Sequence, residues 1–540
     1  MTWILSTSLL AAQAPNILWV VCEDISPTLS MYGESTAHTP HLDALAADGM
    51  VYERAFATVG VCGPSRSAII TGMYPMHIGT QHMRTGKDVQ SWGKRTYAAR
   101  IAAVDIQGDS LREYAAVLPK DVKCFPEYLR QAGYYCTNNQ KTDYQFASPL
   151  SAWDENGTKA HWRNRPEGKP FFAVFNFGST HESRLWLNAN QPLTVDPAQV
   201  PVPPYLPDNE TTRRDVARHY SNVEIMDAEV GRIIQQLKDD GLYDQTIIFF
   251  YSDHGGPLPR QKREVYDSGL RVPLIVKPLA GGAAGRSDRL VSFVDLAPTL
   301  LSIAGVVPPT YMDGVAFMGQ HQGAEHPYIL GSGDRFDEFT DRVRAVRNKR
   351  WLYVRNFFPA LPGYKNIGYR LQIPMMEALL ADAAAQRLND AQARWFATKA
   401  TEELYDCDND PHNLHNLATT PRYANLLREM RETLLEEMTT HPDLGQVAEA
   451  TLIHIMWPGD QQPQTSRPRW DHHDGWIHLH CSTPGASISY QYISADAQTP
   501  TWQTPGWQLY TTPIPAPQKG QRLVVIAERI GYAASELLVW

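Results

Sequence analysis

The chain has 540 residues, of which 43% are apolar and 20% are charged, and its formal net charge is −9 at pH 7. This length exceeds that of one ordinary domain, and the composition excludes a disordered chain. A net negative charge gives no general attraction to nucleic acid or to an anionic membrane surface, so we expect neither partner. No apolar run reaches the roughly 20 residues that a membrane-spanning helix needs, so no membrane span is predicted.

The N-terminus carries a leader pattern. Residues 3–12 form a short apolar stretch that ends in Ala12-Gln13-Ala14, the small-residue pattern that signal peptidases cut. Residues 1–14 are therefore predicted to be a signal or leader segment, and the protein is expected to be periplasmic or secreted. Six cysteines are too few for a disulfide scaffold in a chain of this length.

The first three fifths of the chain alternate strand and helix patterns. Helical spacings occur at His41–Gly49 and from Val223 to Leu237, where Gly241 marks a stop. This alternation predicts an α/β catalytic domain over residues 15–325, with a mostly parallel sheet covered on both faces. Continuous apolar runs typical of buried parallel strands lie at Asn16–Cys22, Phe171–Phe177, Thr246–Tyr251 and Pro273–Val276.

From residue 326 the pattern changes. Short strand signals at Tyr328–Leu330, Val343–Val346 and Trp351–Val354 precede a stripe of apolar residues at helical spacing between Leu426 and Met438. They predict a smaller α+β subdomain over residues 326–455. Residues 456–475 are rich in Pro, Gln and Arg and are predicted to form a linker. Residues 476–540 alternate strand signals with Pro and Gly turns, which predicts a small β-sandwich appendage.

Acidic residues follow two of the predicted strands. Glu23 and Asp24 come directly after the first strand, and Asp253 and His254 follow the strand that ends near Tyr251. Each pair alone would also suit a solvated turn or a helix cap. Because ligands of parallel sheets bind outside the carboxyl ends of the strands, the two pairs together fit one oxygen-rich site for a divalent cation. We expect Ca²⁺, with Mg²⁺ as the alternative, and His254 either binds the ion or supports a ligand.

A third cluster runs from Cys62 through Pro64 and Arg66 to Gly72. A Cys-x-Pro-x-Arg pentapeptide alone could be a structural thiol beside a turn, but the longer string is far more specific. It resembles the signature of the type I sulfatases in the alkaline phosphatase superfamily, and the resemblance covers most of residues 16–418. Further matching segments stand in the family order: Thr39–Asp43, Asp253–Gly255, Tyr266–Pro273, Asp295–Thr299 and Glu403–Asp406.

The resemblance implies an alkaline-phosphatase-like α/β sandwich and a modified nucleophile. In that family a formylglycine-generating enzyme reads the motif and oxidises its cysteine, so Cys62 would be the precursor of formylglycine. The hydrated aldehyde carries two hydroxyls on one carbon. One attacks sulfur and expels the alcohol, and the other loses its proton so that sulfate is released. A divalent cation polarises the sulfate oxygens.

The resemblance also implies the residues of the site. The metal ligands would be Glu23, Asp24, Asp253 and His254, with the converted Cys62 completing the set. Two of them depart from the family pattern, which commonly has Asp at the first position and Asn or Gln at the last. These departures leave the geometry of the site and its metal preference open.

Several other residues match catalytic positions of the family. Arg66 would hold the nucleophile and balance the acidic ligands, Lys141 and Lys262 would bind sulfate, and His181 would assist the leaving alcohol. Arg66, His181 and Lys262 each also have a structural alternative, such as a salt bridge or a solvated surface. Asp143 stands where the family often has a histidine that assists the release of sulfate. It could take that proton itself or contact the sugar.

The predicted function is hydrolysis of sulfate esters of a sulfated carbohydrate, since the sequence looks like the polysaccharide sulfatases and the N-sulfoglucosamine sulfohydrolases. His82, Arg84, Arg335 and Asp337 lie in polar, loop-like segments and are predicted to contact the sugar. One alternative is a sulfamidase of the N-sulfoglucosamine sulfohydrolase type. A phosphonate or phosphate monoester hydrolase is another. A non-catalytic glycan-binding relative is the third, favoured by the departures at Glu23, Asp143 and His254.

Overall fold

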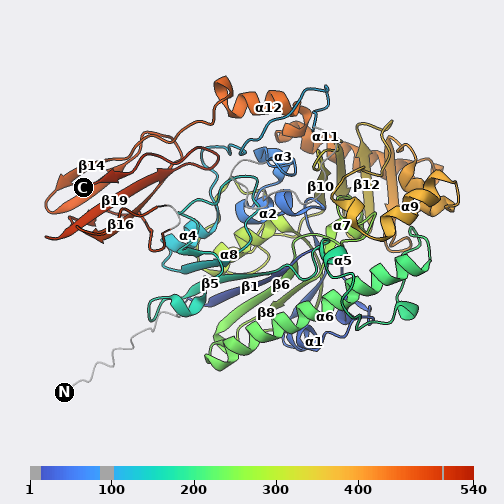
Figure 1. The fold of residues 1–540 in the computed structure, drawn as a ribbon, viewed down its shortest axis with the longest axis horizontal. Helices are drawn as coiled ribbons and strands as arrows, with labels where there is room; N and C mark the ends of the chain where they lie inside the picture. Colours follow the sequence, from blue (N-terminus) through green and yellow to red (C-terminus); the bar gives the residue numbers. More distant parts are fainter. Residues whose placement is uncertain (1–13, 86–102, 502–503) are drawn as a thin grey trace, which may run out of the picture.

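A computed structural model describes residues 14–85, 103–501 and 504–540 (Figure 1). The predicted leader lies outside the described residues except for its last residue, Ala14. Among the helices of the described ranges, none is both long and apolar enough to cross a membrane.

A mixed sheet of nine strands forms the centre of the molecule. Pairing is parallel from β4 through β3, β5 and β1 to β6, whereas β8 runs antiparallel to both of its neighbours, β6 and β2. The expectation of a parallel strand at Pro273–Val276 is therefore wrong in direction, because an apolar run reports burial on both faces rather than orientation. The spatial order is β4 (Glu155–Asn156), β3 (Tyr135–Asn139), β5 (Phe171–Phe177), β1 (Asn16–Cys22), β6 (Thr246–Ser252), β8 (Leu274–Lys277), β2 (Met50–Phe56) and β7 (Arg271–Val272), with β9 (Gly285–Ser292) paired to β2.

Helices cover both faces of this sheet, as the alternation of strands and helices predicted. Alternate residues of β1 enter two separate cores, with Trp19 in one and Val20 in the other. One core includes α2 (Cys62–Thr71), α4 (Pro126–Gln131) and α8 (Leu296–Ile303), and the other includes α1 (Pro40–Ala47) and α6 (Glu210–Asp239) (Figure 1). The predicted stripe from Val223 to Leu237 lies inside α6, which begins earlier because Asn209 caps it by accepting a hydrogen bond from the Thr212 N–H.

A second sheet of four antiparallel strands lies beside the first and is covered by α11 (Ala424–Thr440). Leu427, Met430 and Leu434 of this helix pack on Tyr353 and Leu404 of the sheet. Its strands are β10 (Ile329–Gly333), β11 (Val343–Arg347), β12 (Trp351–Asn356) and β13 (Glu402–Asp406). The remaining helices are α3 (Pro75–Ile78), α5 (Arg184–Leu187), α7 (Asp267–Leu270), α9 (Met375–Ala384), α10 (Asp390–Ala393) and α12 (Glu449–Met456).

The C-terminal region forms two small antiparallel sheets with a shared apolar core, consistent with the expected β-sandwich (Figure 1). Strand β14 pairs with β15 and lies inside residues 456–475, which were expected to be a linker. Its side chains are mostly polar, so hydropathy alone does not indicate a strand there. One sheet holds β14 (Arg469–His473), β15 (Trp476–His480) and β18 (Ile514–Pro515), and the other holds β17 (Gln508–Leu509), β16 (Ser487–Ser494), β19 (Gln521–Glu528) and β20 (Leu538–Val539).

Candidate functional site

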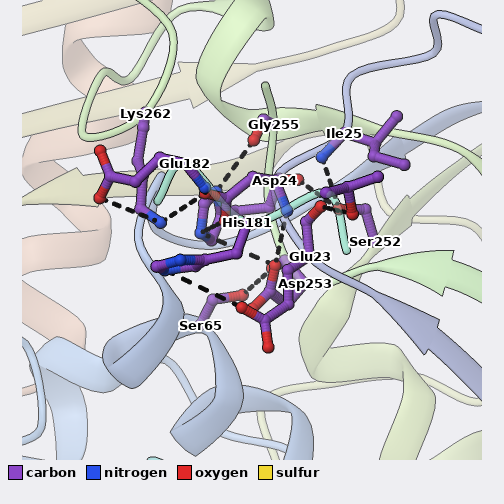
Figure 2. A network of polar contacts seen from close by, with 12 residues as sticks. Glu23, Asp24, Ile25, Ser65, His181, Glu182, Ser252, Asp253, Gly255 and Lys262 are labelled. Atoms are coloured by element: carbon purple, nitrogen blue, oxygen red, sulfur yellow. Dashed lines mark hydrogen bonds and ion pairs between the residues drawn. The ribbon is translucent and has the colours of Figure 1, made fainter. Parts of the chain in front are cut away.

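Four neighbouring parallel strands end at the same edge of the central sheet. The register pairs Cys22 at the end of β1 with Phe177 of β5 and with Ser252 of β6, and β3 lies beside β5. The segments that follow these strands therefore converge, and Figure 2 shows those that follow β1, β5 and β6. They carry Lys141 after β3, His181 and Glu182 after β5, Glu23 and Asp24 after β1, and Asp253 and His254 after β6.

Four buried side chains at this edge could hold a metal ion. Asp24, Cys62, Asp253 and His254 each place a ligand atom within 4.8 Å of the others. Asp24 Oδ1 and His254 Nε2 lie 3.0 Å apart, and among the described residues neither atom finds a well-aligned hydrogen-bond partner. Two such buried atoms, each with a lone pair to offer, fit a cation held between them.

The electrostatics of His254 support the same conclusion. Burial lowers the pKa of its imidazole, but the Asp253 and Asp24 carboxylates outweigh burial and raise the pKa to about 10. The two carboxylates thus favour a positive charge at this point, which either a proton or a metal ion supplies. The donor set of two carboxylates and one imidazole fits a divalent cation.

Glu23 lies beside this group of four. Its carboxylate is 2.9 Å from Lys141 Nζ, 3.8 Å from Arg66 Nη2 and 3.9 Å from His181 Nε2. Glu23 also forms a second group with Asp24 and His181, in which the ligand atoms are within 4.8 Å of one another. The structure therefore places this predicted ligand between the cation group and the predicted sulfate-binding lysine.

Cys62 is the first residue of α2 and its side chain is buried. Burial raises the pKa of the thiol, but the nearby Lys262 and Lys141 ammonium groups outweigh burial and lower it to about 6. The N-terminal end of a helix also favours negative charge. Position 62 therefore stabilises an anion, as a site for a sulfate group requires.

Arg66 lies one helical turn from Cys62 and is held by one partner in β5 and one directly after β6. Its Nε is 3.0 Å from Asp253 Oδ2, and its Nη1 donates to Asn176 Oδ1 at 2.8 Å. The Asn176 amide donates to Asn138 Oδ1 at 3.0 Å, and the Asn138 amide donates to the Lys141 carbonyl at 3.1 Å. We refer to Asn176 and Asn138 as the amide chain. These two residues were not among the predicted site residues, although polar residues within two buried strands are a signal for such a role.

Lys262 is buried against two carboxylates. Its Nζ is 2.6 Å from Asp24 Oδ2 and 3.3 Å from Glu182 Oε1. Glu182 was not among the predicted site residues. Asp143 is buried in a left-handed conformation with φ of 57°. Burial lowers the pKa of the Lys141 ammonium, and Glu23, with a smaller contribution from Asp143, raises it above its ordinary value.

The four predicted sugar contacts fall into two pairs. Arg84 Nε lies 2.6 Å from Asp337 Oδ1, and the Arg84 guanidinium is 5.4 Å from the centre of the Tyr369 ring. His82 and Arg335 are buried with Glu449: Arg335 Nη2 donates to Glu449 Oε1 at 2.7 Å, and its Nη1 donates to two backbone carbonyls. Burial lowers the pKa of His82 to about 4. The structure thus engages His82 and Arg335 in contacts within the protein.

Comparisons with known proteins agree with this geometry. Residues 15–306 match the family model described as Sulfatase. The chain is 43% identical to an ulvan-active sulfatase of Formosa agariphila, over 99% of this chain and 92% of that protein, and 27% identical to human N-sulphoglucosamine sulphohydrolase, over 81% and 93%. A solved structure, the phosphonate monoester hydrolase of Agrobacterium radiobacter, superposes with a TM-score of 0.56 at 18% identity, covering 79% of this chain and 96% of that one. That likeness shows the fold, which is alkaline-phosphatase-like.

Proposed function

Because the chain belongs to the sulfatase family and is a sulfuric ester hydrolase, we propose that it removes sulfate from a sulfated carbohydrate, using a formylglycine formed from Cys62 and one divalent cation. The observation that carries this proposal is the position of Cys62. Cys62 is the first residue of a buried helix, and its sulfur lies within 4.8 Å of the ligand atoms of Asp24, Asp253 and His254. Lys262 and Lys141 stabilise negative charge at this sulfur. The formylglycine-generating enzyme is the proposed maturation partner, and the proposed location is periplasmic or extracellular.

The residues would divide the chemistry as follows. Formylglycine, once formed, supplies as its hydrate the hydroxyl that attacks sulfur. Asp24, Asp253 and His254 would hold Ca²⁺ or Mg²⁺, which polarises sulfate oxygens when bound. Lys141 and Lys262 would bind the sulfate oxygens.

The proton transfers would fall to two further residues. His181 lies at the same edge of the sheet and would protonate the leaving sugar oxygen. Asp143 is buried close enough to Lys141 to affect its pKa, and it would accept the proton that accompanies sulfate release. Arg66 would keep the Asp253 and Glu23 carboxylates in place.

The proposed substrate is an ulvan-type sulfated polysaccharide, supported by the 43% identity to an ulvan-active sulfatase over nearly the whole chain. Arg84, whose side chain is 13% exposed, would contact the sugar, and the buried Asp337 carboxylate would orient its guanidinium. His82 and Arg335 would support this region through their contacts with Glu449. A sulfamidase is the second candidate, supported by the 27% identity to human N-sulphoglucosamine sulphohydrolase.

The test is release of inorganic sulfate, measured by ion chromatography, from protein co-produced with a formylglycine-generating enzyme and supplied with Ca²⁺. The substrates are ulvan, heparan, chondroitin, carrageenan and fucoidan oligosaccharides, N-sulfoglucosamine and an aryl phosphonate monoester. We expect release from ulvan oligosaccharides and none by Cys62→Ala. Turnover of the phosphonate alone, or binding of glycans without release by fully converted protein, would contradict the proposal.

A further inference from the structure

An alternating series of charges links the cation site to the predicted sugar contacts. The successive ion pairs measure 2.6, 3.3, 2.7, 3.6 and 2.6 Å, and every side chain in the series is at most 2% exposed except that of Arg84, at 13%. The members in order are Asp24, Lys262, Glu182, Arg263, Asp337 and Arg84.

Glu182 contacts both sides of this series. Its carboxylate accepts two hydrogen bonds from Arg263, at 2.9 and 2.7 Å, and lies 3.3 Å from Lys262 Nζ. Its backbone N–H donates to Asp24 Oδ2 at 2.7 Å, the same oxygen that accepts a hydrogen bond from Lys262 at 2.6 Å. Figure 2 shows Glu182 and Lys262 lying next to Asp24. Glu182 is therefore one partner of the Lys262 ammonium, and its backbone N–H also holds the other partner, Asp24.

A lysine side chain has a flexible four-carbon stem, so a single partner does not fix its ammonium in space. Asp24 belongs to the group that would share its charge with a cation, whereas Glu182 lies outside that group. The bidentate contact with Arg263 in turn locks the orientation of the Glu182 carboxylate.

We propose that Glu182 is a positioning residue that holds the Lys262 ammonium where it binds the sulfate group of the substrate. This inference rests on the proposed function, in which Lys262 binds sulfate. If Glu182 had a structural role alone, it would only neutralise the buried charge of Arg263. A positioning role differs from this structural role because replacing Glu182 then changes sulfate binding only while Lys262 is present.

A double-mutant cycle separates them. Glu182→Gln, Lys262→Met and the double variant are made in a Cys62→Ala background, and the affinity for sodium sulfate is measured by thermal shift against sodium chloride of equal ionic strength. We expect Glu182→Gln to weaken sulfate binding about tenfold, and to have no further effect once Lys262 is Met. An equal loss in both backgrounds, or no loss in either, would overturn the proposal.

Stability is controlled in two ways. Asp443→Asn removes a carboxylate from another buried bidentate arginine pair, with Arg344, and should lower the melting temperature without changing sulfate affinity. If Glu182→Gln does not fold, Glu182→Gln/Arg263→Gln removes both charges of the pair, and the same cycle with Lys262→Met is run in that background. The proposal would then be overturned if the Glu182→Gln/Arg263→Gln variant, which keeps Lys262, bound sulfate as tightly as the parent.

In converted enzyme with Cys62 restored, Glu182→Gln should lower kcat by about 10- to 100-fold. Absence of sulfate release by the parent enzyme would count against the proposed function, whereas the binding cycle would still report on Glu182 and Lys262. The two failures are therefore distinguishable.

Discussion

Replacing Asn176 with alanine tests whether the amide chain positions Arg66. The change removes three hydrogen bonds: one accepted from Arg66 Nη1 at 2.8 Å, and two donated, to Asn138 Oδ1 at 3.0 Å and to the Asn139 carbonyl at 3.2 Å. A bond to a charged group contributes about 1.5–3 kcal/mol and a neutral one about 0.5–1.5 kcal/mol. Asn176 is half-buried, so water can replace part of this network.

We therefore expect the free energy of unfolding to fall by about 2–4 kcal/mol. We also expect kcat to fall by about 10- to 100-fold, because Arg66 loses its contact with β5 and moves relative to Asp253. The assays are thermal denaturation and sulfate release, the latter at a temperature where all variants are folded.

Asn356→Ala is the matched control. The Asn356 amide donates to the Ala400 carbonyl and to Glu403 Oε1, each at 2.7 Å, in the second sheet. Its loss should lower stability to a similar degree while kcat stays unchanged. The reasoning would be refuted if Asn176→Ala kept the kcat of the parent, or if both variants lost kcat equally.

Three further predictions follow from the site and the core. Cys62→Ala should keep the melting temperature of the parent and release no sulfate; measurable turnover by this variant would exclude position 62 as the nucleophile. A chelator should abolish turnover, and Ca²⁺ should restore it, because Asp24, Asp253 and His254 converge on one point; full activity after dialysis against the chelator would contradict this. Burial raises the pKa of Asp215 from 3.8 to about 7. The folded state then holds a proton that the unfolded state releases, so stability falls as pH rises from about 4 through 7. Asp215→Asn, whose amide oxygen can still accept the Met375 N–H, should melt at a higher temperature than the parent near pH 8, and this difference should shrink as the pH is lowered through 5 toward 4; a difference in melting temperature that does not change with pH would refute the burial argument.

The sequence was most informative where local pattern and topology agree. Apolar runs in the sequence predict β1, β5 and β6, and the rule that ligands lie at the carboxyl ends of parallel strands predicts that Asp24 and Asp253 share one site. An apolar run does not predict the direction of β8, because a strand buried on both faces has the same pattern whether its pairing is parallel or antiparallel.

The supporting residues were less accessible to sequence. Glu182 and Arg263 contact partners that are far away along the chain, so no local spacing indicates their roles. Asn176 stands out locally as a polar residue within an apolar strand, but its partner Arg66 is more than one hundred residues away. Polar residues in loops, such as His82 and Arg335, looked available to a ligand. In the folded chain they are buried against Glu449, a partner more than one hundred residues away.

The most direct test of the central claim is sulfate ester hydrolysis in water labelled with heavy oxygen. Attack on sulfur from position 62 predicts that converted enzyme places the label in the released sulfate and none in the sugar hydroxyl, and that Cys62→Ala forms neither product. Label in the sugar hydroxyl, or equal sulfate release by Cys62→Ala, would contradict the account.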